Sequence, residues 1–151
     1  MQAHEIMISK VYKVKETDTV RTVLEYFIEY RISGLPIIND QNEIVAYISD
    51  GDIMRYIGKH KDIVVSSIYA MNAFQGDVEG FEERVQSILD LNVLRIAKNK
   101  VVKVAWNEDI ENVAAILGNK QIKKLPVERD GVLVGVISRG DVIRHTFKSV
   151  L

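Results

Sequence analysis

The chain has 151 residues, of which 47% are hydrophobic and 27% charged, the composition of a globular protein with a substantial core. Its 20 basic residues balance 21 acidic ones without any basic block, so the sequence gives no support for nucleic-acid binding. No apolar run approaches the roughly 18 residues of a membrane span, the N-terminus lacks a signal-peptide pattern, and cysteine is absent. We therefore expect a cytoplasmic protein without membrane attachment.

The first part of the chain predicts a β-α-β-β-α unit. Residues 11–14 form a β-branched run typical of a strand. Thr17 is a candidate N-cap, and it is followed by apolar positions at helical spacing: Val20, Val23, Leu24, Phe27 and Ile28. The remaining predicted elements are a strand at 35–38, a turn at 39–42, a return strand at 43–48 and a helix at 50–57.

The next stretch, residues 58–92, is a connector that belongs to neither copy of the repeat described below. We predict a short helix within residues 62–74. A second helix is indicated by apolar positions that share one helical face: Phe81, Val85, Ile88 and Leu89. The connector is therefore expected to be partly helical.

The unit then returns in residues 93–151, with the Leu35-Pro36 dipeptide recurring as Leu125-Pro126. At the same offset of 90 residues, five more positions are repeated: Val11, Lys13, Val14, Val23 and Ile32. After one deletion in a turn, the identities resume at Val45, Ile48, Ser49, Gly51, Asp52 and Arg55. The sequence thus predicts an α+β protein in which repeats 1–57 and 93–151 pack with pseudo-two-fold symmetry and form clefts between them.

One pattern in the repeat resembles a known family. The β-α-β-β-α order, the Leu-Pro strand and the segment from Gly135 to Asp141 resemble the CBS domain, and two such domains in tandem resemble a Bateman module. The resemblance implies a stand-alone regulatory module that binds an adenine nucleotide, with AMP as the preferred ligand, in the cleft between its repeats. It also implies a homodimer that pairs through the last helices, and it leaves room for an unidentified regulated protein.

The family's binding pattern is a glycine, two apolar residues, serine or threonine, any two residues, and aspartate. The second repeat matches it in full with Gly135, Ser138 and Asp141, whereas the first repeat keeps Ser49 and Asp52 but replaces the glycine with Ala46. A carboxylate can accept both ribose hydroxyls, and a serine at a helix start suits a phosphate. The glycine lets a ligand approach the backbone closely.

The residue after each serine separates the two motifs. Arg139 would attract a phosphate beside Ser138, whereas Asp50 would repel one beside Ser49, by about 1–4 kcal/mol depending on solvent exposure. We therefore favour the cleft built around Asp141.

Each of these motifs can also be explained without a bound ligand. Ser-x-x-Asp is a variant of a capping box, which stabilises a helix start by itself. Lys123-Lys124 could contact a phosphate or form a solvated face, and Trp106 could stack on a base or pack in the fold. A scaffold that binds another protein, with empty and degenerate clefts, is therefore the alternative function.

Catalysis and cofactor chemistry are not predicted. The sequence has no glycine-rich phosphate loop and no nucleophile with an identifiable base. Its 3 histidines lack the spacing of metal ligands. We therefore expect a protein that is not an enzyme and that has no metal or resident cofactor.

Overall fold

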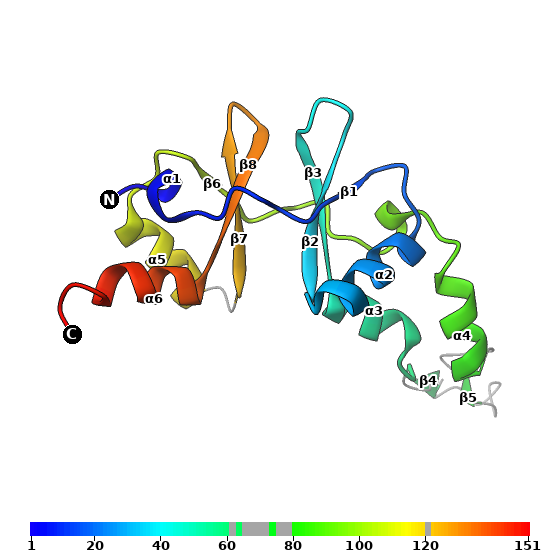
Figure 1. The fold of residues 1–151 in the computed structure, drawn as a ribbon. Coiled ribbons are helices and arrows are strands. Elements are labelled where there is room, and N and C mark those ends of the chain that lie inside the picture. The colour runs from blue at the N-terminus through cyan, green and yellow to red at the C-terminus, as the bar shows by residue number, and fades with distance from the viewer. Residues whose placement is uncertain (61–62, 65–72, 75–79, 120–121) are drawn as a thin grey trace.

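The computed structural model describes residues 1–60, 63–64, 73–74, 80–119 and 122–151 (Figure 1). Both halves have the predicted β-α-β-β-α order. The first half consists of β1 (Val14–Lys15), α2 (Val20–Tyr30), β2 (Gly34–Ile38), β3 (Ile44–Ser49) and α3 (Asp50–Ile57). The second half consists of β6 (Val104–Ala105), α5 (Ile110–Asn119), β7 (Lys124–Arg129), β8 (Val132–Ser138) and α6 (Arg139–Phe147). Three further helical elements are α1 (Ala3–Ile6), α4 (Phe81–Ile88) and the 3₁₀ turn η1 (Val93–Arg95).

The sheets of the two halves have the same topology, which confirms the predicted repeat. Each has three strands, in the orders β1-β2-β3 and β6-β7-β8, with a parallel first pair and an antiparallel second pair. Leu35 lies opposite Ile48, and Leu125 lies opposite Ile137 in the same register. Pro36 lies in the middle strand, and its missing N–H is tolerated because β1 pairs only with Ile37 and Ile38.

Each sheet has helices on its outer side, and the two halves meet in the centre of the molecule (Figure 1). The first core contains the buried residues Leu35, Ile37 and Ile48, and the second contains their counterparts Leu125, Val127 and Ile137. A third, smaller cluster joins the halves and consists of Ile38, Ile44 and Leu133, flanked by Val11 and Val101. The halves therefore form one body with apolar contacts between them.

Two segments are exchanged between the halves. We call residues 2–8 and 92–98 the exchanged segments. Ile8 pairs with Val136 of the second sheet, and Lys98 pairs with Tyr47 of the first. Ala3 and Ile6 are accordingly buried in the second core, whereas Val93 is buried in the first. The packing units therefore differ from the sequence repeats, because each repeat begins with a segment that completes the other half.

Some predicted details differ from the structure. The first strand of each half begins at Val14 or Val104, three residues later than expected, because the preceding residues cross between the halves. The helix predicted within 62–74 is wrong at both ends, where Ile63–Val64 pairs with Ala73–Phe74 as antiparallel strands; residues 65–72 lie outside the described part. Helix α4 is confirmed, but its Phe81 is 53% exposed rather than buried.

Candidate functional site

The predicted binding motifs lie where β3 enters α3 and where β8 enters α6. In the second half, the Oδ2 atom of Asp141 accepts hydrogen bonds from the Ser138 N–H (2.8 Å) and the Ser138 hydroxyl (2.9 Å). Its Oδ1 atom accepts one from the Arg144 guanidinium (2.8 Å). The Asp141 N–H donates back to the Ser138 hydroxyl (3.2 Å). This is a complete capping box with an added ion pair.

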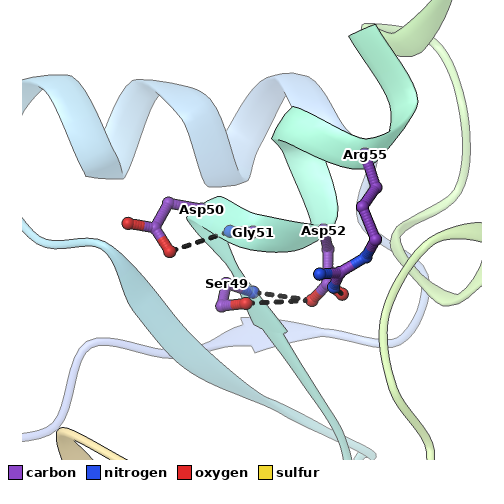
Figure 2. A network of polar contacts seen from close by, with 5 residues as sticks. All are labelled: Ser49, Asp50, Gly51, Asp52 and Arg55. Carbon is purple, nitrogen blue, oxygen red and sulfur yellow. Dashed lines mark hydrogen bonds and ion pairs between the residues drawn. The ribbon is translucent and has the colours of Figure 1, made fainter. Parts of the chain in front are cut away.

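The first motif has the same arrangement, shown in Figure 2. Asp52 accepts from the N–H (2.9 Å) and hydroxyl (3.3 Å) of Ser49 through one oxygen, and from Arg55 through the other. Both Asp52 and Asp141 are only 5% exposed. Ser-x-x-Asp therefore forms a capping box in both halves. A ribose would have to share carboxylates that already accept hydrogen bonds.

The environment of Asp141 favours its charged form. Burial alone would raise the pKa of this carboxyl, but the hydrogen bonds from the Ser138 N–H and hydroxyl and from Arg144 outweigh burial. The pKa of Asp141 is therefore held below its ordinary value. The carboxylate is an ionised acceptor at neutral pH.

Both motifs border a single cleft between the halves, with a volume of about 940 Å³. From the second motif, Ser138, Arg139 and Gly140 line it; from the first, Ser49, Asp50 and Asp52 do. Of the predicted site residues, Asp141 and Gly135 lie outside this lining. Residues of both motifs therefore line one shared cleft.

Gly135 has a packing partner that the sequence did not reveal. A Cβ atom at Gly135 would lie 2.8 Å from Cγ of Met7 and closer still to its sulfur, so the exchanged segment fills the space beside this glycine. Ala46, the counterpart of Gly135, is buried in the first core, against which Ala97 packs at the position equivalent to Met7. The counterparts of Gly135 and Met7 are thus two alanines in the first half, and close packing of Met7 accounts for the glycine in the second.

Arg139 is anchored away from Ser138. Its Nε donates to the carbonyl oxygen of Leu117 in the last turn of α5 (3.0 Å) and to that of Ile122 shortly before β7 (3.1 Å). The side chain therefore satisfies one carbonyl group at the C-terminus of α5 and a second one beyond it. It also lines the cleft, so its positive charge remains beside the candidate site.

Four lysines line the same cleft: Lys98, Lys100, Lys123 and Lys124. Lys123 and Lys124 were candidates from the sequence, and the structure brings both to the cleft. Lys98 and Lys100 were not, because their segment reaches the cleft only by crossing to the first sheet. The one sequence signal was their place in the repeat, since Lys98 stands where the first copy has Ile8.

Tyr47 is the aromatic residue of the cleft lining. Its hydroxyl lies over Gly34, where a Cβ atom would come within 2.6 Å of it. Burial, and to a lesser extent the nearby Asp50 carboxylate, raises the pKa of Tyr47 to about 12. The Tyr47 hydroxyl is therefore neutral at physiological pH.

Trp106, the aromatic candidate from the sequence, is packed in the fold. The Arg129 guanidinium carbon lies 4.3 Å from its ring centroid, and the His4 ring lies 5.1 Å away. These contacts support the packing interpretation of Trp106. Within the described residues, no helix combines the length and apolar character needed to cross a bilayer.

This arrangement is that of a tandem pair of α+β domains. A sequence model of the CBS domain matches residues 3–59 and 93–148, most of the chain. The chain therefore belongs to the CBS domain family and contains the domain twice.

Two curated relatives extend along almost the whole chain. The chain is 28% identical to MJ1426 of Methanocaldococcus jannaschii over 153 residues, covering 95% of the chain and 89% of the relative. It is 30% identical to the chloroplastic CBS domain-containing protein CBSX1 of Arabidopsis thaliana over 152 residues. That match covers 93% of the chain but only 61% of CBSX1.

Solved structures share the fold. CBSX2 in complex with AMP has a TM-score of 0.74 at 21% identity, with 99% of this chain and 98% of that one covered. The CBS domain pair of MJ0100, in complex with 5′-methylthioadenosine and S-adenosyl-L-methionine, has a TM-score of 0.69 at 16% identity, with 99% and 98% covered. These similarities confirm the predicted tandem CBS fold.

Proposed function

We propose that the protein is a cytoplasmic regulatory module that binds an adenine nucleotide in the cleft between its halves. The observation that carries this proposal is the cleft itself, which is bordered by both motif starts and by four lysines. The crystallised relatives CBSX2 and MJ0100, which hold AMP and adenosyl compounds, support the same ligand class. Because residues of both halves line the cleft, a change in their relative tilt alters the ligand's contacts, as a sensor requires.

The nucleotide would lie against the starts of α3 and α6. Ser49 and Ser138 offer hydroxyl groups there, and Tyr47 offers an aromatic face for the base. A ribose hydroxyl would reach the remaining acceptor position of the Asp141 Oδ1 atom only after neighbouring side chains move, because Asp141 is 5% exposed and lies outside the cleft lining. Bound ligand would be signalled to a regulated protein by the change in shape of the pair.

The second candidate is a scaffold for another protein, with an empty cleft. It is favoured by the capping boxes, in which Asp52 and Asp141 already have hydrogen-bond partners without any ligand. It is also favoured by apolar side chains left exposed on α3 and α6, since Met54 is 57% and Ile143 58% exposed. The same side chains suit the homodimer that we propose.

A thermal-shift series distinguishes the two functions. The probes are AMP, ADP, ATP, adenosine and S-adenosylmethionine, each at rising concentration. A ligand at about 100 times its dissociation constant stabilises the folded state by roughly 2.7 kcal/mol, which corresponds to about 5–10 °C in Tm for a chain of this size. Absence of a shift with all five compounds would reject the sensor and favour the scaffold.

A further inference from the structure

We propose that the cleft selects a nucleotide with a chain of two or more phosphates over a monophosphate. This inference rests on the proposed function and specifies the ligand class of the same site. It follows from the number, the pairing and the placement of the charges that line the cleft.

The lining carries a marked excess of positive charge. The cations are Lys98, Lys100, Lys123, Lys124 and Arg139, and the carboxylates are Asp50 and Asp52. Asp52 is already neutralised by its ion pair with Arg55, so Asp50 alone opposes five cations. A phosphate monoester carries about two negative charges at neutral pH, and each further phosphate of a nucleotide adds at least one more. A di- or triphosphate therefore balances this lining better than AMP does.

The lysines have no competing partner within the described residues. The ion pairs there involve Lys15, Arg21, Arg55, Lys103 and Arg144, none of which lines the cleft. The side-chain hydrogen bonds of the described part likewise leave the four lysines unengaged. Like charges gathered in a concave surface repel one another and focus the field on an incoming anion. Binding an extended anion thus relieves a repulsion that the free protein carries.

The charges lie on both walls of the cleft. Lys98 is held at the first sheet by two backbone hydrogen bonds to Tyr47, each 2.9 Å long, and Lys100 follows it. Lys123 and Lys124 lie on the opposite wall, beside the carbonyl group of Ile122 that Arg139 ties down. A single phosphate cannot reach both walls as well as a chain of phosphates can. The volume of about 940 Å³ is near the upper end of ordinary ligand sites, about 300–1,000 Å³, so the longer ligand has room.

The pseudo-symmetry supplies a matched control. The first-copy counterparts of Lys98, Lys123 and Lys124 are the uncharged Ile8, Ser33 and Gly34. Lys10 is the counterpart of Lys100 and keeps its charge, but it lies outside the cleft lining. Replacement of Lys10 therefore removes the same side chain at an equivalent position without touching the proposed phosphate site.

Isothermal titration calorimetry with adenosine, AMP, ADP and ATP tests the proposal on the full chain, without added divalent cations. We expect affinity to rise at least tenfold from AMP to ATP and the ATP affinity to fall more steeply with salt. Lys100→Ala and Lys124→Ala should each lower the affinity for ATP about three- to tenfold and the affinity for AMP by less. Lys10→Ala should change neither affinity. The Gly51 N–H donates to Asp50 Oδ1 at 2.8 Å, and Asp50→Asn keeps an oxygen for this hydrogen bond. Because this variant removes a negative charge from the cleft, it should raise the affinity for ATP several-fold.

The outcomes separate this proposal from the one on which it rests. AMP binding as tight as ATP would overturn the selection for longer phosphate chains and leave the nucleotide sensor intact. Absence of binding by every adenine compound would overturn both. Inorganic tripolyphosphate serves as the last probe. If it binds as tightly as ATP, the cleft recognises negative charge alone, and the proposal that it selects a nucleotide is overturned. Circular dichroism of each variant confirms that the fold is retained.

Discussion

Replacement of Asp141 tests whether its carboxylate stabilises the fold before any ligand arrives. In Asp141→Ala the Ser138 N–H and the Ser138 hydroxyl each lose the carboxylate oxygen that they donate to, at about 1 kcal/mol apiece, while the Ser138 hydroxyl still caps the backbone N–H of residue 141. The ion pair with Arg144 adds less than about 1 kcal/mol because that side chain is 69% exposed. We expect a loss of about 2–3 kcal/mol in the free energy of unfolding, or roughly 4–12 °C in Tm.

The measurement is urea and thermal unfolding of the nucleotide-free protein. Arg144→Ala is the control, since it removes only the exposed ion pair and should cost less than about 1 kcal/mol. A variant Asp141→Ala that is as stable as the wild type would refute the reasoning. If that variant had also lost nucleotide binding, the carboxylate would act on ligand alone.

The same carboxylate makes stability depend on pH in a definite direction. Because the pKa of Asp141 is lowered in the folded state, its contribution is fully present above the unfolded value of about 3.9. It is lost as pH falls through the lower, folded-state pKa. The stability difference between wild type and Asp141→Asn should therefore be constant from pH 7 to about pH 5 and shrink below pH 4. A difference that instead grew on acidification would contradict the direction of the shift.

Three further predictions follow from packing and exposure. Gly135→Ala should destabilise by about 1–3 kcal/mol because its Cβ clashes with the side chain of Met7, and Met7→Ala in the same chain should recover part of that loss in urea unfolding. Tyr47→Phe should remove the phase near pH 12 from a spectrophotometric tyrosine titration; a loss of amplitude near pH 10 instead would mean that the Tyr47 hydroxyl is solvated. Met54→Glu combined with Ile143→Glu should convert the proposed homodimer to a monomer by light scattering, and a wild type already monomeric would reject that interface.

Local patterns were enough to predict the elements of each half. The apolar spacing through Val20 and Val23 and the recurring Leu-Pro dipeptide gave the β-α-β-β-α order and its duplication, because such signals depend only on neighbouring residues. The Ser138 and Asp141 pattern was informative but ambiguous. A capping box and a nucleotide site require the same residues at the same spacing. The structure shows that these residues form a capping box.

The cleft could be predicted only in part. Lys98 and Lys100 reach it because their segment crosses to the other half, which is a tertiary arrangement without a local signal. The role of Gly135 was predicted from ligand approach, yet its neighbour is Met7, over 120 residues away in the sequence. Long-range contacts of this kind are invisible to periodicity and spacing.

The exchanged segments have a consequence for how such a chain can arise. Ile8 pairs with the second sheet and Lys98 with the first, so neither half alone contains all the strands and helices that cover its core. A single unit of this kind would fold by trading its leading segment with another copy, as in domain swapping. Joining two such copies end to end retains every contact and turns an association that depends on concentration into an intramolecular one. A fused pair can also carry unequal charges on its two halves, since it is free of the symmetry that two identical chains impose.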